Sequence, residues 1–332
     1  MPEKRKPLQS DGLAAEDCKG SDSAECLPGR IERYGKARAH ALQTLAHVDQ
    51  QLNALDYFSR SRLDSVASRL RQCGSYLVFA HYYTVDTVRL THATFCKAHL
   101  LCPLCAIRRG AKQVRAYLQR LDVILKDNPH LVPYLVTLTV SNGPDLRERF
   151  NHLHASMRLY CSRMRDADKK GRGYCELNKI RGAVWSYEVT NKGNGWHPHL
   201  HMVALVDPAN PLQFDPKRPK ASKLSKEWAS ITGDSFIVDC RPIVGDPADG
   251  FVEVFKYALK FSELKPADNL HAWEVLSGRR LVSSFGLFRG VDVPDDLTDA
   301  ALEDLPFVRL FYRYTPSGYS LEGFAEAEPP AA

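Results

Sequence analysis

The stretch 196-WHPHLHMVALV-206 places three histidines at alternate positions and then continues into an apolar run. Side chains on a β-strand alternate between the two faces of a sheet, so His197, His199 and His201 point to one side. The apolar residues between them point to the other side. This alternation predicts a strand over 197–206 with one packed face and one face of imidazoles.

The strand before this one offers a carboxylate to the histidine row. RGAVWSYEVT (181–190) has strand character and is joined to the histidine strand by the turn-rich NKGNG, which predicts an antiparallel hairpin. The hairpin brings Glu188 opposite the histidines. Imidazole is a common ligand of divalent metals, and a carboxylate completes a site for Mg²⁺ or Mn²⁺. A lone surface histidine is more often without a role, but three in register favour a metal site made of His199, His201 and Glu188, with His197 as a further candidate.

The order of the other elements predicts the fold class. PYLVTLTVSN (133–142) is β-branched and ends at Asn-Gly-Pro, so it is expected to form a buried strand. Periodicity predicts helices over 145–165, 220–232 and 250–264 and a strand over 235–244. The resulting order, β-α-β-β-α-β and then a helix, predicts an α+β fold with a central antiparallel sheet of the split βαβ, ferredoxin-like kind.

The helix containing 253-EVFKYALK-260 places Glu253, Tyr257 and Lys260 at i, i+4 and i+7, on one helical face. A phenol with a pKa of about 10 is a poor nucleophile at neutral pH unless cations favour its phenolate. Lys256, Lys260 or the metal can provide that charge, so the group suits nucleophilic catalysis. Taken alone, an amphipathic helix with a surface Glu–Lys pair and a half-buried tyrosine explains the same pattern.

The stretch 96-CKAHLLCPLC-105 has the spacing C-x5-C-x2-C, with His99 inside it. The Cys-Pro-x-Cys element is typical of tetrahedral zinc sites, whereas a redox CxxC usually opens a helix after a strand. The sequence therefore predicts a structural Zn²⁺ bound by Cys96, Cys102, Cys105 and His99. The other cysteines are expected to be ordinary thiols: Cys18, Cys26, Cys73, Cys161, Cys175 and Cys240.

A basic segment, AIRRGAKQVRAYLQR (106–120), follows the cysteines and contains no acidic residue. The net charge of +6 permits a nucleic-acid partner without requiring one. A solvated helix face explains the segment alone. Its position after the cysteine cluster favours a phosphate-facing surface of Arg108, Arg109, Lys112 and Arg115.

No apolar run approaches the roughly 18 residues of a membrane span. The polar N-terminal stretch has no apolar core after its basic residues, so it is not a secretory signal. We therefore expect a cytoplasmic protein with reduced cysteines and no membrane partner.

Together these residues resemble the replication initiators of rolling-circle plasmids, a branch of the HUH endonucleases. VTLTV (136–140) looks like the family's first motif, and HPHLH (197–201) is similar to the second, a His-hydrophobic-His metal site. EVFKYALK (253–260) looks like the third, in which tyrosine is the nucleophile. The cysteine segment followed by paired arginines also resembles this family, and the resemblance covers residues from about 95 to 290.

The resemblance implies site- and strand-specific nicking of single-stranded or hairpin origin DNA of a plasmid. His199 and His201, with Glu188 or His197, would hold Mg²⁺ or Mn²⁺. Tyr257 would attack the scissile phosphate, leaving a 5′-phosphotyrosine and a free 3′-OH that primes a host polymerase.

The resemblance also assigns the remaining charged residues. Glu253 would activate water at termination, and Lys256 and Lys260 would contact phosphate. The zinc segment and the basic helix would bind the DNA backbone, and a host helicase would act beside the polymerase.

The patterns and the resemblance together predict five parts of the chain. They are a disordered N-terminus (1–30), a helical and zinc-knuckle DNA-binding region (31–130), an HUH nicking domain (131–266), a C-terminal extension of the catalytic domain (267–314) and a flexible tail (315–332).

Other functions share some of these features. A transposase or a mobilisation relaxase uses the same chemistry on another DNA end, although relaxases usually carry the tyrosine near the N-terminus. In a zinc-dependent DNA-binding regulator, Tyr257 would be structural and no strand would be cleaved. A small-molecule metallohydrolase would leave the tyrosine helix and the zinc–arginine segment unexplained.

Overall fold

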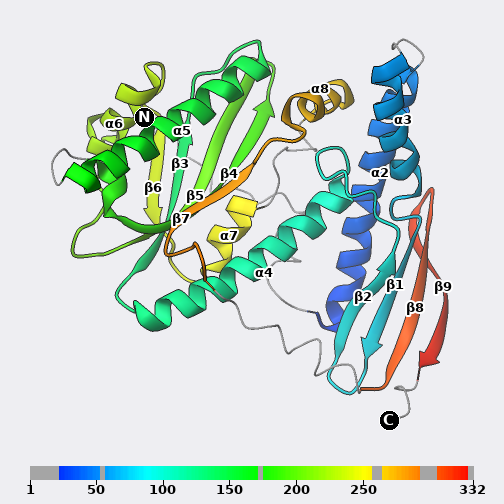
Figure 1. The fold of residues 1–332 in the computed structure, drawn as a ribbon. Coiled ribbons are helices and arrows are strands. Elements are labelled where there is room, and N and C mark those ends of the chain that lie inside the picture. The colour runs from blue at the N-terminus through cyan, green and yellow to red at the C-terminus, as the bar shows by residue number, and fades with distance from the viewer. Residues whose placement is uncertain (1–21, 53–56, 171–174, 256–263, 292–304, 328–332) are drawn as a thin grey trace. The chain divides into compact units, whose positions relative to one another are not determined.

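The structure is a computed structural model of the 332-residue chain and describes residues 22–52, 57–170, 175–255, 264–291 and 305–327. The chain divides into two compact units, which are considered separately. The first consists of residues 1–111 and 294–332, and the second of residues 112–293. Both units contain helices and an antiparallel sheet (Figure 1), which confirms the predicted α+β class and the N-terminal helices.

The first unit contains a four-stranded sheet with the order β2-β1-β8-β9, in which each adjacent pair is antiparallel. Its elements are η1 (Ala24–Cys26), α2 (Leu27–Leu52), α3 (Tyr57–Gln72), β1 (Tyr76–Tyr82), β2 (Thr87–Ala93), β8 (Phe307–Thr315) and β9 (Gly318–Ala327). Helix α2 contacts both α3 and β9. It does so through a buried stripe at three- to four-residue spacing that includes Ala37, Ala41, Leu45 and Val48.

Two predictions for this part of the chain differ from the structure. Residues 24–30, predicted as disordered, belong to η1 and the start of α2. Strands β8 and β9 occupy 307–327, which the sequence predicts to be a catalytic-domain extension and a flexible tail. The physical reason is long-range pairing, because β8 hydrogen-bonds to β1, more than 200 residues earlier, and β9 completes the hairpin.

The second unit is built around a five-stranded sheet with the order β6-β3-β5-β4-β7, again antiparallel throughout. Helix α4 (Pro103–Asp127) begins in the first unit and ends in the second, so the division does not fall after residue 130 as predicted. The other elements are β3 (Val132–Thr139), α5 (Leu146–Lys170), η2 (Glu176–Lys179), β4 (Ile180–Asn191), β5 (Trp196–Val206), η3 (Pro219–Ala221), α6 (Lys223–Thr232), β6 (Val238–Pro242), α7 (Ala248–Phe255), α8 (Pro266–Leu276) and β7 (Val282–Gly286).

Helices cover both faces of this sheet. On one face, α5 packs on β5 and α6 packs on β6, and Tyr187 of β4 contacts the ring of Phe150 in α5. On the other face, α7 contacts β4 and β5, and the Ser186 hydroxyl donates a hydrogen bond to the carbonyl of Val254. Neighbouring residues of β4 therefore face different helices, as strand alternation requires.

Strand β7 extends the sheet beyond the predicted hairpin. It pairs with β4 from Gly182 to Ser186. A Cβ atom at Gly182 would lie 2.8 Å from the backbone nitrogen of Leu287, so only glycine permits this close approach. No strand is predicted here from the sequence, because five residues with no matching turn signal do not identify one.

No helix in the described part of the chain is both long and apolar enough to cross a membrane.

The β9 strand should contribute measurably to stability. The Tyr319 hydroxyl donates a 2.6 Å hydrogen bond to the carbonyl of Gly74, at the turn between α3 and β1. We expect Tyr319→Phe to lower the free energy of unfolding by about 1 kcal/mol, because a partly buried carbonyl loses its donor. Denaturant unfolding measures this, with Tyr83→Phe in the exposed β1–β2 turn as control. Equal free energies of unfolding for the two variants would show that the hydrogen bond from Tyr319 of β9 does not stabilise this unit.

Candidate functional site

Two paired strands bring one carboxylate and two imidazoles together. In the β4–β5 register Glu188 lies opposite His199, and Ser186 lies opposite His201. The three side chains point to the α7 face and are almost fully buried, with exposures of 1% for Glu188, 8% for His199 and 7% for His201. The predicted strand alternation and hairpin are thus present at this position.

The donor atoms of these residues converge. Oε1 of Glu188 lies 3.4 Å from Nε2 of His199, and Oε2 lies 3.3 Å from Nε2 of His201. One ligand atom from each residue lies within 4.8 Å of the others. This compact set of two nitrogens and one carboxylate can hold a divalent cation.

Hydrogen bonds orient both imidazoles. Nδ1 of His199 lies 3.2 Å from the carbonyl oxygen of His197, which can only accept, so this nitrogen carries the proton. Nδ1 of His201 lies 3.1 Å from the hydroxyl of Thr137 on β3. When both Nδ1 atoms are engaged in this way, both Nε2 atoms face Glu188 and can offer a lone pair to a metal. The donor set therefore suits a divalent metal ion, and the Mg²⁺ or Mn²⁺ expected from the sequence stays a prediction.

The charge of the carboxylate is stabilised locally. Burial by itself raises the pKa of Glu188, but its interactions with His199 and then His201 outweigh this and hold the pKa well below its ordinary value. These interactions favour the ionised form of Glu188 at this buried position.

His197 does not join the three converging residues. Its ring centroid lies 5.3 Å from that of His199, and the described residues that form the group are Glu188, His199 and His201. Burial lowers the pKa of His197 to about 4, so its ring is neutral at neutral pH. Its backbone carbonyl, not its ring, orients His199.

A second carboxylate reaches the same group from α7. Oε1 of Glu253 lies 3.7 Å from Nε2 of His201, and the side chain is largely buried. The sequence places Glu253 on a helix with Tyr257 but does not show that it contacts a metal-site histidine. Tyr257, Lys256 and Lys260 lie outside the described residues.

Four buried cysteines form a second cluster, in the first unit. The Sγ atom of Cys73 lies 3.5 Å from that of Cys102 and 3.6 Å from that of Cys105, and Cys96 lies 3.5 Å from Cys105. Sulfur atoms around Zn²⁺, with bonds of about 2.3 Å, are about 3.8 Å apart in a tetrahedron. The cluster therefore has close to the dimensions of a four-thiolate metal site and the donor set that Zn²⁺ prefers.

The cluster corrects one predicted ligand. Cys73, predicted to be an ordinary thiol, takes the fourth position, and His99 does not belong to the group. Cys73 follows the last turn of α3, and Gly74 continues the chain with φ of +68°, a conformation that favours glycine. This turn carries the chain into β1 and leaves the Cys73 thiol beside the start of α4.

The thiols in this cluster influence one another. Hydrogen bonding from Cys102 lowers the pKa of Cys73, whereas hydrogen bonding with Cys105 raises the pKa of Cys102. Four adjacent thiols therefore cannot all ionise without a cation to balance their charge.

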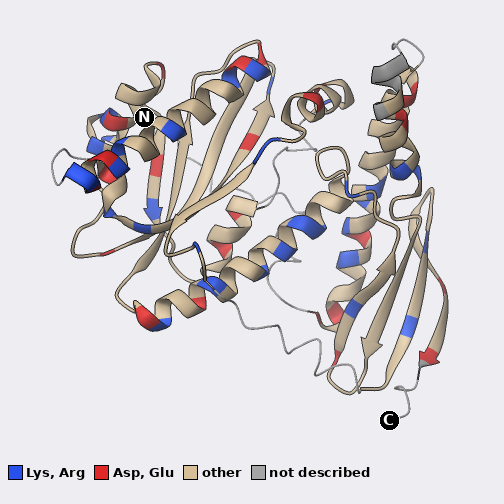
Figure 2. Ribbon diagram, in the orientation of Figure 1, with Lys and Arg blue, Asp and Glu red and all other residues tan. Residues whose placement is uncertain are grey.

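The basic segment forms the exposed side of α4 (Figure 2). Arg108, Arg109, Lys112 and Arg115 are all exposed, and acidic residues of α4 occur only near its C-terminal end. The Arg108 guanidinium lies 3.9 Å from the ring centroid of Phe95, just before the first cysteine of the cluster. The helix therefore presents cations that can contact phosphate groups.

Comparison with known proteins gives consistent matches. The family described as "Replication protein" matches residues 87–308. A "Protein rep" of Streptococcus pneumoniae serotype 2 (strain D39 / NCTC 7466) is 26% identical in an alignment of 269 residues that covers 74% of this chain and 76% of that protein. A "Protein rep" of Lactiplantibacillus plantarum is 25% identical in an alignment of 264 residues that covers 73% of this chain and 78% of that protein. No solved structure gives a significant match.

The cysteine geometry predicts which residues retain a metal. Cys73→Ser should lower the metal bound per chain, measured by elemental analysis of purified protein, because one of four thiolate ligands is lost. His99→Ala should leave it unchanged. Cys175→Ser serves as the control, since Cys175 is a buried cysteine outside the cluster. Loss of metal in His99→Ala and retention in Cys73→Ser would restore the ligand set predicted from the sequence.

Proposed function

Because the chain belongs to the replication protein family that matches residues 87–308, we propose that it initiates rolling-circle replication of a plasmid by nicking origin DNA. The observation that carries the proposal is the buried Glu188–His199–His201 group with Glu253 beside it. A phosphodiester is an anionic substrate, and a cation site lined by carboxylate and imidazole ligands is suited to binding and polarising it.

The sheet topology supports an HUH-type core. The elements β3, α5, β4, β5, α6 and β6 follow each other along the chain, and their strands have the spatial order β6-β3-β5-β4. This is the arrangement expected of a split βαβ sheet. It puts the histidine strand in the middle of the sheet, where neighbouring strands on both sides can support the site.

The proposed cation is Mg²⁺ or Mn²⁺, held by His199, His201 and Glu188. When bound there, it supplies Lewis-acid polarisation of a phosphate oxygen. Thr137 and the His197 carbonyl orient the two imidazoles for this task. His197 itself is a positioning residue in this proposal, not a ligand.

The proposed nucleophile is Tyr257, two residues beyond the end of α7. Its phenolic oxygen forms a bond to phosphorus, the bond from phosphorus to the 3′-oxygen breaks, and that oxygen takes up a proton. The products are a 5′-phosphotyrosine and a free 3′-OH that primes a host polymerase. The phosphodiester energy is retained in the covalent bond, so no nucleotide hydrolysis is required.

Glu253 is proposed to act at termination. Its carboxylate would take a proton from the attacking group, which is either a water molecule or the hydroxyl of the returning strand. The oxygen of that group would then attack phosphorus and release the strand end. The Glu253 carboxylate lies 3.7 Å from Nε2 of His201, which would place it next to a phosphate bound at the proposed cation site. Lys256 and Lys260 are proposed to contact phosphate beside the nucleophile.

The basic side of α4 and a zinc-bound cysteine cluster are proposed to bind the DNA backbone. In this arrangement Zn²⁺ would join the α3–β1 turn to the first turn of α4 through Cys73, Cys96, Cys102 and Cys105. The substrate would be single-stranded or hairpin origin DNA in the cytoplasm, with a host helicase and polymerase acting after the nick.

The covalent intermediate gives the decisive test. Purified protein with Mn²⁺ and single strands from its replicon should form a denaturant-resistant adduct, which peptide mass spectrometry should locate on Tyr257. Tyr257→Phe should abolish the adduct and keep DNA binding, while Tyr83→Phe should retain both. DNA binding by the wild-type protein without any adduct would instead favour a zinc-dependent DNA-binding regulator.

The hydrogen bond to His201 gives a second prediction. Thr137→Val should raise the Mn²⁺ concentration needed for half-maximal nicking about 10- to 100-fold, because orienting partners of ligand histidines contribute that much to metal affinity. Thr137→Ser keeps the hydroxyl and should stay close to wild type. If the valine variant instead lowers nicking at all Mn²⁺ concentrations without a shift in the midpoint, Thr137 acts through the fold and not through His201.

A further inference from the structure

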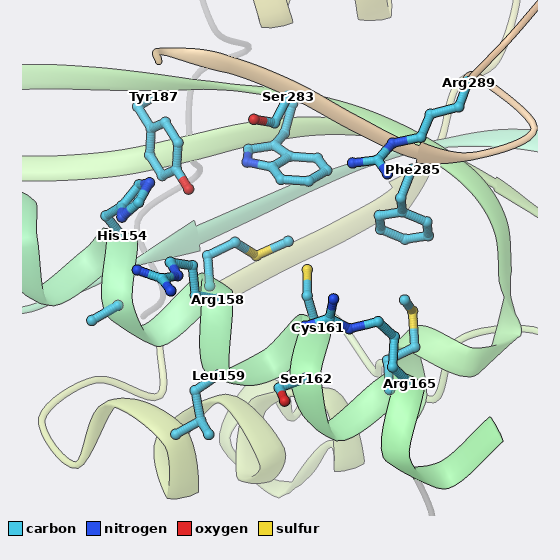
Figure 3. A pocket seen from close by; sticks show the side chains of 14 residues that line it. His154, Arg158, Leu159, Cys161, Ser162, Arg165, Tyr187, Ser283, Phe285 and Arg289 are labelled. Carbon is cyan, nitrogen blue, oxygen red and sulfur yellow. The ribbon is translucent and has the colours of Figure 1, made fainter. Parts of the chain in front are cut away.

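A cavity of about 640 Å³ lies on the other face of the same sheet from the Glu188 group. It is formed between α5 and the edge of the sheet where β4 pairs with β7 (Figure 3). Cavities of this size commonly accept a small organic group, because ligand pockets span about 300–1,000 Å³. None of the residues proposed for nicking lines this cavity.

The sheet side of the cavity is aromatic. Trp185 and Tyr187 alternate with Ser186 along β4, so they face α5 while Ser186 and Glu188 face α7. Phe285 of β7 lies beside them, with its ring centroid 6.0 Å from that of Trp185. Trp185 and Tyr187 are buried in the sheet wall of the cavity, whereas Phe285 is half-buried. Together the rings give this wall aromatic edges and one more accessible ring, Phe285, against which a planar base can stack.

The other side of the cavity is cationic. Arg158 and Arg165 lie two helical turns apart on α5, and both are exposed at the rim. Arg289 follows β7, and its Nε donates a 2.7 Å hydrogen bond to the carbonyl of Ser284. Figure 3 shows its guanidinium beside Phe285, directed into the cavity. Within the described part of the chain, no carboxylate lies at ion-pair distance from these three arginines, so their charge is available to an anionic ligand.

Aromatic rings and available guanidinium groups around one cavity match a ligand that has both a flat base and a phosphate. We propose that this cavity binds one nucleotide of a single DNA strand, with its base against Trp185 and Phe285 and its phosphates on Arg158 and Arg165. An acidic peptide would use the arginines but leave the aromatic side of the cavity uncovered. A lipid surface would require a continuous apolar rim, whereas Leu159 is the exposed large apolar side chain of this lining and three arginines accompany it.

The bound nucleotide is distinct from the one that is cleaved, because the sheet separates the cavity from the Glu188 group. Phosphate contacts carry no sequence information, but a base held in a cavity can be selected by its shape and edges. In this proposal the cavity therefore contributes to recognition of the DNA sequence. This inference relies on the proposed DNA substrate, but not on the nicking chemistry.

Cys161 provides a direct readout, because it lines the cavity between the two α5 arginines (Figure 3). The rate of its alkylation by N-ethylmaleimide can be followed by peptide mass spectrometry, with no Mg²⁺ or Mn²⁺ added so that the strands are not cleaved. A pool of mixed-sequence single-stranded oligonucleotides should slow alkylation of Cys161 about tenfold when it is saturating. Alkylation of the buried Cys175 in the same sample reports any loss of folding.

Substitutions on α5 distinguish binding in the cavity from non-specific attraction of DNA to exposed arginines. Arg158→Ala combined with Arg165→Ala should abolish protection by the pool. Arg163→Ala is the matched control, since this exposed arginine lies on the same helix but bonds to Ser230 and does not line the cavity. Trp185→Leu should weaken binding of the pool about tenfold through lost stacking.

Two results would overturn the proposal. One is unchanged alkylation of Cys161 at concentrations where the pool is bound by the wild-type protein. The other is protection by thymidine 5′-monophosphate but not by the pool, which would identify a free nucleotide as the ligand. The proposed nicking function is tested separately, because His199→Ala should lose cleavage while the pool still protects Cys161.

Discussion

The pairing register of β4 and β5 is the constraint on which the candidate site depends. Glu188 faces α7 and its imidazole partners only because it lies opposite His199. A slip of one residue would turn Glu188 toward α5 and bring Tyr187 into the metal group. The polar group does not hold this register by itself. The register is held by burial of the apolar residues of both strands, which contributes about 1.5–3 kcal/mol for each fully buried large side chain. Leu200 and Met202, on the face of β5 away from the histidines, are fully buried.

The same constraint explains why the site favours a cation. Removing a carboxylate from water is costly, and burial by itself raises the pKa of Glu188. Its interactions with His199 and His201 outweigh this effect, and each imidazole is oriented by a partner that lies outside the group. A fold that buries a carboxylate, orients two nitrogens toward it and adds Glu253 at 3.7 Å from His201 concentrates negative charge in a small volume. That arrangement is stable when a divalent cation shares the charge.

The features that were predictable from sequence are local ones. The histidine strand and Glu188 could be identified because neighbouring residues determine both the alternation of side chains and the hairpin turn. The basic side of α4 could be identified because it is a single helix.

Cys73 could not be identified as a ligand from the sequence. A turn and a hairpin separate it from Cys96, and only the tertiary fold brings its thiol to Cys102. His99 was expected in its place because it is near in sequence. Strand β8 was missed for the same reason, since its partner β1 lies at the other end of the chain, and β9 was missed with it because β9 pairs with β8. The roles of Tyr257, Lys256 and Lys260 stay predictions, since these residues lie outside the described part of the chain.

Strand β4 serves both faces of the sheet with alternate residues. Ser186 and Glu188 meet α7, and Trp185 and Tyr187 line the cavity beside α5. Because a β-strand sends neighbouring side chains to opposite faces, chemistry and recognition can be changed independently at adjacent positions. The backbone that holds the two sets is nevertheless the same, and β7 pairs with it from Gly182 to Ser186. A DNA strand that occupies both faces must pass around the edge of the sheet formed by β7. The close approach that Gly182 permits therefore matters for more than packing, since it places Phe285 and Arg289 at the edge such a strand would have to cross.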